Sequence, residues 1–478
     1  MEKTTPLFSL KNIPIPSKFE YEKKLVQKAE SLLDRMRWKI SVAKNPEAFQ
    51  NNYETFGFNT TNKPGQDKDL MRFEEDFLDL ISPNNLTYKI INNEFQNNFK
   101  QEVRNIKNSD RVTVFADKTR NLYKDTVQSV DAKLMESITK DYKRCDETKV
   151  NEINTEAAEI AKSFPTSKDQ TLADRIDVLD RNEAFITFKD TKEGFPGRVQ
   201  TRLINRSKSN IGIISKAILD RINQNLRTKT GLNQWKSSQD VLNWFNNLAD
   251  KQNYTFLKLD IVSFYPSITE ELLLDAINWA KTLTPISNEE IKIIIHSRKS
   301  LLFYKKKPWI KKDNPNFDVT QGSNDGAEIS ELVGLFLLDG LKRFIKKEQQ
   351  GIYRDDFLAI VKLSGPQVER LRKDLFKFFE AKKLKITIEA NITETDFLDI
   401  SFNLISGIHK PFRKDDNIPT YINKQSNHPT HIKNNLPTMI SKRISMLSSN
   451  EQVFNQEAYI YNEGLKQSGY NDKIHIHT

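Results

Sequence analysis

The sequence predicts an α+β fold built around a small antiparallel sheet, and two stretches of the chain indicate it. Apolar runs on either side of Tyr353–Asp356 are typical of two strands joined by a tight turn. Upstream, Leu257, Leu259 and Ile261 alternate with polar residues, which is the period of a strand with one buried face. Helical spacing in the segments between these strands indicates that helix and sheet are mixed within one unit.

A helix is predicted soon after the upstream strand. Ser267–Glu270 matches a capping box, and the apolar residues from Leu272 to Ala280 continue with helical spacing. Asp260 therefore lies near the end of a strand, just before a turn into a helix.

Three carboxylates predict a metal-dependent site. Asp355 and Asp356 lie at the tip of the predicted hairpin, where adjacent carboxylates repel each other unless a hard cation neutralises them. With Asp260 they form the layout that holds two Mg²⁺ ions about 3.5–4 Å apart. Each group alone also fits an ordinary acidic turn or strand end, so the ordered set carries the prediction.

Over residues 185–430 the chain resembles the reverse transcriptase family. The family's first motif, Asp-x-x-x-x-aromatic, matches Asp260 and Tyr265, its second matches Gln321–Gly322, and its third matches Tyr353–Asp356. The motifs stand in the family's order, about 60 and 30 residues apart. The resemblance implies a right-hand polymerase with fingers, an antiparallel-sheet palm with helices on one face, and a short helical thumb.

The same resemblance implies an RNA-directed DNA polymerase that extends a primer 3′-hydroxyl with deoxynucleoside triphosphates. Asp260, Asp355, Asp356 and the carbonyl of Ile261 would hold two Mg²⁺ ions, for which Mn²⁺ is an expected substitute. The expected partners are an RNA template, a DNA or RNA primer and the nucleotides.

Two other polymerase families share parts of this pattern. The string from Asp260 to Ile268 also resembles the first motif of family B DNA polymerases, which carry Asp-Thr-Asp as their third motif. Viral RNA-dependent RNA polymerases favour Gly-Asp-Asp, and have a second Asp where this chain has Tyr265. A ring at Tyr265 would abut the sugar 2′ carbon, which predicts selection of deoxynucleotides. An ordinary core aromatic is the alternative.

The second motif is predicted to contact the incoming nucleotide. By resemblance, Gln321 touches the nucleotide and the backbone at Gly322 lies against the templating pair. A helix is expected from Ala327 to about Ile345, after a turn-rich loop. Residues 324–326 differ from the Pro and Ser that are usual in the family, and a simple polar loop is the alternative.

Basic residues upstream predict a phosphate-binding region. Thr187–Lys236 holds 11 Lys and Arg against 3 Asp and Glu. Within it, Phe188–Lys192 and Thr201–Asn205 resemble the two strands of the fingers hairpin. Relatives grip the triphosphate with a Lys and an Arg from these strands, so we expect the groups given next to contact nucleotide, unless they form only a solvated basic face. They are Arg202 as the firmest choice, with Lys189 and Lys192 as competing candidates.

After the third motif the sequence predicts a helix over Asp374–Lys383 and a strand over Leu384–Glu389. A Lys near here protonates the leaving pyrophosphate in many polymerases, and Lys382, Lys383 and Lys385 all compete for that role.

The segment Phe397–Phe402 resembles a hairpin that grips the primer end, although an ordinary apolar hairpin fits equally well. Further on, the stretch from Lys410 to Pro429 resembles the corresponding part of Penelope-like retroelement enzymes. The residues expected to contact primer or template are Tyr353, Phe397, Leu398, Arg413 and Lys414.

The chain divides into four expected parts. Residues 1–110 form a mostly helical extension of unknown role, 111–250 the fingers, 251–400 the palm, and 401–478 the thumb and C-terminal region. Within the first two parts, helices are expected over Glu20–Ile40 and Asp69–Ile81, a loop over Asn45–Asp67 and a strand over Val112–Ala116.

Composition supports a nucleic-acid partner. The 478 residues carry a formal net charge of +10, and the isoelectric point is near 9.2. The single Cys145 excludes an internal disulfide and any Cys-rich zinc module, and with the absence of a secretory pattern it predicts an intracellular protein, cytoplasmic or nuclear. No apolar run predicts a membrane span.

Two alternatives to a reverse transcriptase stay open on the sequence. One is a non-catalytic RNA-binding protein of the maturase kind, and the other is a DNA-templated or template-independent DNA polymerase. The sequence leaves template preference, biological role and oligomeric state undecided.

Overall fold

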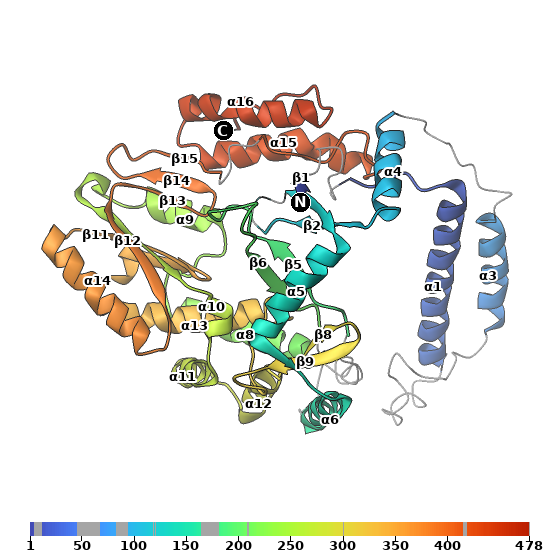
Figure 1. The fold of residues 1–478 in the computed structure, drawn as a ribbon, viewed down its shortest axis with the longest axis horizontal. Helices are drawn as coiled ribbons and strands as arrows, with labels where there is room; N and C mark the ends of the chain where they lie inside the picture. The colour runs from blue at the N-terminus through green and yellow to red at the C-terminus, as the bar shows by residue number, and fades with distance from the viewer. Residues whose placement is uncertain are drawn as a thin grey trace.

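A computed structural model describes residues 1–3, 12–44, 67–82, 94–117, 119, 121–163, 181–207, 210–299, 301–413 and 418–477. Nearly all of the loop predicted over Asn45–Asp67 lies outside these residues, and so does Lys414. Figure 1 shows the arrangement of the helices and strands. None of the helices in the described ranges combines the length and apolar composition needed to span a bilayer.

The central sheet has four antiparallel strands. Their order across the sheet is β10 (Gln350–Tyr353), β11 (Asp356–Val361), β7 (Thr255–Ile261) and β12 (Ile386–Ile392). The predicted strand around Asp260 and the predicted hairpin are thereby confirmed. β7 lies between β11 and β12, so strands from three separate parts of the chain meet at it.

The two faces of this sheet are covered by different elements. Leu257, Leu259 and Phe357 belong to a core formed with helices. Phe256 and Leu358 point to the other face, as strand alternation requires, and pack with a helix and two hairpins. The prediction of helices on one face is therefore incomplete. The first set is α8 (Asn210–Thr230), α11 (Glu270–Lys281), α12 (Asn288–His296), α13 (Gly326–Leu341) and α14 (Gly365–Glu380); the second is α9 (Ser238–Asn246), β13 (Glu394–Phe397), β14 (Ile400–Asn403) and β15 (His409–Pro411).

Smaller sheets lie beside the central one. Three of them are β1 (Glu2–Lys3) with β3 (Leu122–Thr126) and β2 (Arg111–Phe115); β5 (Phe185–Phe188) with β6 (Thr201–Ile204); and β4 (Tyr142–Arg144) with β9 (Lys307–Lys311) and β8 (Leu302–Tyr304). The helices α5 (Val127–Asp141) and α6 (Glu147–Ser163) accompany them, and 3₁₀ turns cover Lys251–Asn253 and Lys347–Gln349.

The first strand of the β5–β6 hairpin lies earlier than predicted. It ends at Phe188. The backbone then turns, and the amide of Lys192 donates to the carbonyl of Lys189 at 3.2 Å. Lys189 and Lys192 therefore follow the strand instead of lying on it.

Helix boundaries also differ from the sequence prediction. The cap of α11 is Thr269, whose hydroxyl accepts a hydrogen bond from the amide of Leu272 at 3.2 Å. Ser267 instead ends a short helix, α10 (Phe264–Ser267). α13 ends at Leu341 and α14 begins at Gly365, where Ser364 and Gln367 form a capping box.

The N-terminal extension is helical, as expected, and reaches the C-terminal helices. Its helices are α1 (Lys18–Lys44), α3 (Lys68–Leu80) and α4 (Glu94–Lys107), and the C-terminal pair is α15 (Thr430–Leu447) and α16 (Glu451–Gln467). α1 and α3 lie side by side at the right of Figure 1 and are joined by the ion pair of Arg37 with Glu74 at 2.6 Å.

Candidate active site

Asp260 and Asp356 face each other across two neighbouring strands. They are direct register partners in the β11–β7 ladder, so their side chains leave the same face of the sheet. At the same level, the amide of Ile261 donates to the carbonyl of Asp355 at 3.4 Å. The backbone thus brings the three predicted carboxylates to one end of the sheet, although about 95 residues of chain separate Asp260 from the other two.

This end of the sheet opens to solvent. Phe256 and Leu358 are buried on the same face, but Asp260 is exposed and Asp356 is only partly buried. Between the strands, Arg354 has a φ of +55°, which a non-glycine residue rarely adopts. The hairpin tip is therefore a tight turn at the border between core and water.

The donor chemistry suits a hard cation. Carboxylates directly opposite each other in a sheet repel, and carboxylate oxygens are the ligands that Mg²⁺ prefers. The side chains, however, are not gathered into a finished site, because the described residues contain no cluster of three or more His, Cys, Asp or Glu placed to hold a metal. The ladder fixes the backbone positions, and a cation would have to draw the side chains together.

The second predicted motif packs directly against the β5–β6 hairpin. The amide of Asn205, just after β6, donates to the carbonyl of Gln321 at 3.0 Å. Gly322 has a φ of +111°, and a Cβ added there would lie 2.2 Å from the carbonyl oxygen of Asn205. Only glycine fits this contact without a backbone shift.

Tyr265 connects the first motif to the second. The Tyr265 ring is partly buried and lies beside Gly326, the first residue of α13. A Cβ added to Gly326 would be 3.5 Å from Cε1 of the ring. The tyrosine after the Asp260 strand and the loop that carries Gln321 are therefore neighbours.

The fold is shared with known structures. The chain is similar to telomerase from Candida albicans, solved with a fragment of telomeric RNA, at 11% identity over 84% of this chain and 68% of that one, with a TM-score of 0.52. It is also similar to apo telomerase from Candida tropicalis (11% identity, 90% and 74% covered, TM-score 0.48) and to the RNA-dependent RNA polymerase of a human picobirnavirus (9%, 84% and 82%, 0.44). The chain has a right-hand polymerase fold.

The sequence comparisons add one partial match. A family model described as an animal helix-turn-helix domain matches residues 420–478, which hold α15 and α16. No curated protein matches the sequence.

A buried ion pair anchors the loop that carries Gln321, and the sequence did not predict it. Arg298 is fully buried and pairs with Asp325, which is 1% exposed and directly precedes α13. The hydroxyl of Ser297 also donates to Asp325 at 2.7 Å. The residues that depart from the family pattern after Gly322 thus include the anchor of the loop.

A second polar group joins the β4–β9–β8 sheet to α10 and to the chain that precedes Gln321. Lys311 lies 3.1 Å from the carboxylate of Asp318 and also donates to the carbonyl of Pro266 at 3.3 Å. The hydroxyl of Tyr142 donates to Asp318 at 2.6 Å, and burial together with this carboxylate raises the pKa of Tyr142. The β4–β9–β8 sheet is therefore tied to α10 and to Asp318, three residues before Gln321.

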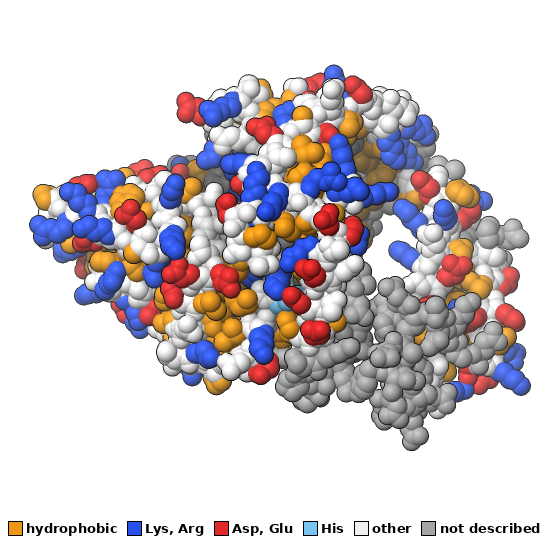
Figure 2. All heavy atoms as spheres, turned by 60° about the horizontal axis from the view of Figure 1, so that its bottom comes forward, with side chains coloured by type: hydrophobic (Ala, Val, Ile, Leu, Met, Phe, Trp, Pro, Cys, Tyr) orange, Lys and Arg blue, Asp and Glu red, His pale blue; other side chains and the backbone are white. Residues whose placement is uncertain are grey.

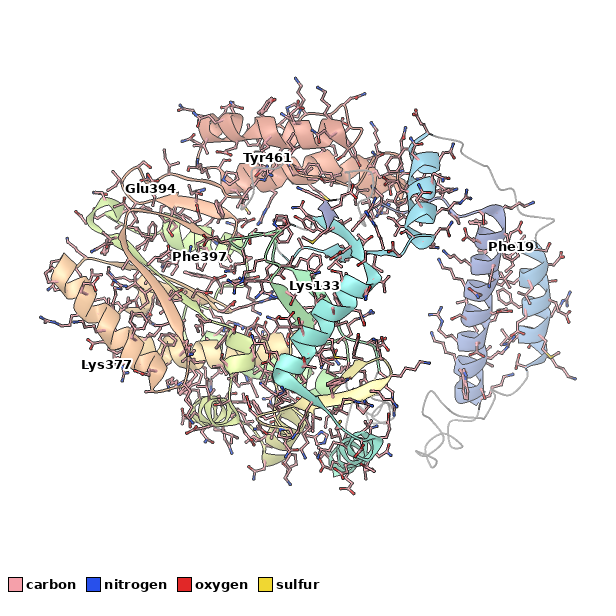
Figure 3. All side chains as sticks on the ribbon, in the orientation of Figure 1. Phe19, Lys133, Lys377, Glu394, Phe397 and Tyr461 are labelled. Atoms are coloured by element: carbon pink, nitrogen blue, oxygen red, sulfur yellow. The ribbon has the colours of Figure 1, made fainter. Side chains whose placement is uncertain are left out.

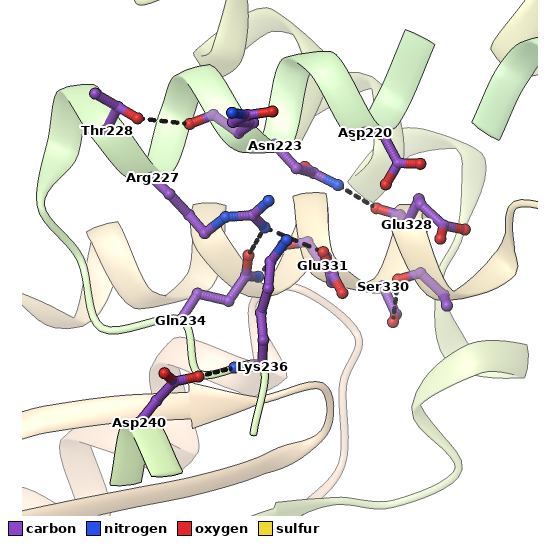
Figure 4. Close-up of polar contacts among 12 residues, drawn as sticks. Asp220, Asn223, Arg227, Thr228, Gln234, Lys236, Asp240, Glu328, Ser330 and Glu331 are labelled. Carbon is purple, nitrogen blue, oxygen red and sulfur yellow. Dashed lines mark hydrogen bonds and ion pairs between the residues drawn. The ribbon is translucent and has the colours of Figure 1, made fainter. Parts of the chain in front are cut away.

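α13 is held against α8 by the contacts in Figure 4. Arg227 donates to Gln234 at 2.8 Å and pairs with Glu331 at 3.1 Å. Asn223 donates to the carbonyl of Glu328 at 2.9 Å. These contacts fix the helix that follows the second motif.

The predicted phosphate-binding cations lie on the fingers hairpin or just after its first strand. Arg202 on β6 lies opposite Thr187 on β5, and its guanidinium forms an ion pair with Asp117 at 3.1 Å. Lys189 is partly buried, and Lys192 is exposed in the turn that follows.

The structure separates the three lysines that compete as proton donors. Lys382 lies over the rings of Phe336 and Phe378, and Lys383 pairs with Glu271 at 2.7 Å. Lys385 is exposed, and its carbonyl accepts from the amide of Val262 at 2.9 Å. Thr387 opposes Asp260 in the β12–β7 ladder. Lys385 lies two residues before Thr387, just ahead of β12, and the alternation of the strand places it on the same face.

The expected primer-contacting residues have mixed positions. Phe397 is 2% exposed and packs on Trp235, with ring centroids 5.5 Å apart, so its ring is a core group (Figure 3). Leu398, with a φ of +56°, forms the β13–β14 turn and is partly buried. Tyr353 is partly buried with the guanidinium of Arg354 5.5 Å from its ring centre, and Arg413 lies 5.9 Å from the ring centre of Tyr461.

Proposed function

We propose that the chain is an RNA-directed DNA polymerase, which extends a primer 3′-hydroxyl with deoxynucleoside triphosphates along an RNA template. The observation that carries the proposal is the register of Asp260 against Asp356, beside the turn at Asp355, on a polymerase fold. A protein that only bound RNA would not need like charges opposed at an open sheet end.

In the proposed mechanism the protein mainly positions charge. Asp260, Asp355, Asp356 and the Ile261 carbonyl would hold the two Mg²⁺ ions. When bound, these ions lower the pKa of the primer hydroxyl and neutralise charge on the phosphates. The carboxylates thus set where the 3′-oxygen and the α-phosphate meet, and alignment supplies much of the acceleration.

The remaining groups hold the nucleotide and its leaving group. Arg202, with Lys189 or Lys192, would contact the triphosphate from the fingers, and Gln321 with the backbone of Gly322 would lie against the nucleotide. Lys385 would give the Nζ proton to the departing pyrophosphate, because it shares a sheet face with Asp260.

The test is primer extension on matched RNA and DNA templates with Mg²⁺. Changing Asp355 to Asn should lower extension by at least roughly 100-fold, because metal neutralisation is worth several kcal/mol. Binding of primer–template should stay within about twofold, since the fold and the basic surface are unchanged. Asp275→Asn, an exposed carboxylate on α11, is the matched control.

Equal extension by Asp355→Asn and wild-type protein would remove the catalytic assignment. Extension on DNA templates alone would favour a DNA-templated polymerase. RNA binding with no extension by the wild-type protein would favour the maturase-like alternative.

Sugar selection tests the role of Tyr265. Tyr265→Ala should raise the use of ribonucleotides relative to deoxynucleotides by roughly tenfold, because the ring no longer occupies the space beside the 2′ carbon. Tyr265→Phe keeps the ring and should keep the selection. If the Ala variant discriminates as the wild type does, the ring serves only to pack against Gly326.

A further inference from the structure

A hollow lies on the outer side of the palm, between the end of α13 and α14. Its volume is about 530 Å³, and it is lined by Arg343, Phe344, Asp374, Lys377, Phe378, Ala381 and Lys382. Three of these residues are cations and only one is a carboxylate. In Figure 3, Lys377 marks the lower end of α14, where the hollow lies.

Aromatic rings, and not carboxylates, hold two of the cations. The Arg343 guanidinium carbon lies 4.6 Å from the ring centre of Phe344 and 4.8 Å from that of Phe378. The Lys382 Nζ lies 4.3 Å from the ring centre of Phe336. Rings fix a cation in place without cancelling its charge.

Among the described residues that line the hollow, the positive charges outnumber the negative ones. No described Asp or Glu forms an ion pair with Arg343, Lys377 or Lys382, although Asp374 lines the same hollow. Burial lowers the pKa of Lys382, and Arg343 lowers it further, against the opposite effect of Asp275. An anion in the hollow would relieve this repulsion.

The surroundings extend the positive surface. Exposed Lys346, Arg370 and Lys373 lie on the neighbouring turns of chain. Figure 2 shows Lys and Arg side chains gathered at the left end of the molecule, where α14 lies. A ligand with several phosphates in a row would meet cations beyond the hollow as well as within it.

The hollow is separate from the catalytic turn. α13 passes the catalytic turn at Gly334, where an added Cβ would lie 3.6 Å from the carbonyl oxygen of Arg354. α13 ends at Leu341, seven residues later (341 minus 334) and about 10 Å along the helix axis, and Arg343 lies beyond this end.

We propose that this hollow binds the phosphate backbone of a nucleic-acid strand outside the catalytic cleft, taking the chain to be the nucleic-acid polymerase proposed above. Arg343 and Lys377 donate to phosphate oxygens from opposite sides, and Lys382 supplies charge from the floor of the hollow. Guanidinium and ammonium groups are the usual partners of phosphodiesters.

The experiment measures fluorescence anisotropy of a labelled single-stranded RNA 20-mer, added to the full chain already saturated with a short primer–template. Arg343→Gln/Lys377→Gln should weaken RNA binding by about five- to tenfold and reduce the salt slope by about 1.4, at about 0.7 per lost contact. Lys23→Gln/Lys24→Gln on α1 removes the same charge from another exposed surface and should change binding less than twofold.

A gain of function separates binding from misfolding. Asp374→Asn removes the one carboxylate among the described residues that line the hollow, and should tighten RNA binding by about two- to threefold. Arg343→Lys keeps the charge and should retain most of the affinity. Primer extension should stay within twofold of wild type for all these variants. A wild-type protein that binds RNA but does not extend a primer would count against the proposed function and not against the hollow.

Several results would overturn the proposal. Equal weakening in the α1 control would show a general charge effect, and unchanged affinity in the double variant would exclude the hollow as a contact. Displacement of RNA by micromolar inorganic pyrophosphate would indicate a small-phosphate site. If the double variant bound RNA normally but no longer bound vesicles containing phosphatidylserine, the hollow would be a lipid-binding surface.

Discussion

The palm and the N-terminal extension are held in place by different kinds of contact. In the palm, β7 is hydrogen-bonded along both edges and buried over most of both faces. The extension meets the C-terminal region through a small number of hydrogen bonds, and the side chain of Gln96 links both regions. Gln96 is 1% exposed, donates to the carbonyl of Gln425 at 2.8 Å and accepts from the amide of Ile15 at 2.9 Å.

A few backbone contacts complete this second junction. The amide of Ile13 donates to the hydroxyl of Ser426 at 2.8 Å, and its carbonyl accepts from the amide of Asn427 at 2.9 Å. α4 lies against β2, so the N-terminal chain connects the β1–β3–β2 sheet to the C-terminal region. The sheet is held by many ladder hydrogen bonds, whereas this junction depends on a few. A single substitution should therefore change the stability of the junction more than that of the sheet.

The largest effect is expected in the palm, at the buried ion pair of Arg298 with Asp325. Changing Arg298 to Met leaves the Asp325 carboxylate buried without its cation, and should lower the free energy of unfolding by about 3–5 kcal/mol. Chemical denaturation followed by tryptophan fluorescence measures this change.

The matched control removes both charges. Arg298→Met/Asp325→Leu should recover much of the lost stability, because no unpaired charge stays buried. If the double variant is as unstable as the single one, packing volume and not charge holds the loop in place.

A smaller loss of stability with a larger loss of activity is expected at Gly322. An alanine Cβ would meet the Asn205 carbonyl at 2.2 Å, and the φ of +111° disfavours any side chain. We expect Gly322→Ala to lower stability by about 1–3 kcal/mol and to displace Gln321 from the fingers hairpin. Nucleotide KM in primer extension should rise clearly.

Gly365→Ala is the control for this substitution, because nothing lies within 4 Å of a Cβ added there. It should leave both stability and KM near wild-type values. An unchanged KM in Gly322→Ala would separate the second motif from nucleotide binding.

The sequence predicted the palm well because ladders leave a period-two trace. The alternation at Leu257–Ile261 and the two apolar runs around Tyr353–Asp356 each predicted a strand, and all three strands are present. The α11 cap was wrong because Ser267 and Thr269 are both good capping residues, and the helix start depends on the short α10 before them.

Contacts between single distant residues left no such trace. Nothing in the sequence linked Arg298 to Asp325 or Gln96 to Gln425, since polar pairs of this kind have no period. Phe397 was correctly placed in a hairpin, but its burial is decided by Trp235, which belongs to a distant segment. The pattern of apolar residues therefore predicted the strands, whereas the surroundings of each side chain could be known only from the folded structure.

The most local effect is expected at the N-terminal junction. Gln96→Ala removes the hydrogen bonds to Ile15 and Gln425 and should cost about 1–3 kcal/mol locally, because buried backbone groups lose their partners. Amide hydrogen exchange should rise in residues 12–17 and 420–427, while β7 and β11 keep their protection. Gln101→Ala, on an exposed face of the same helix, should change neither region. Faster exchange in β7 as well would mean that the junction and the palm unfold as one unit, and that the two kinds of contact are not independent.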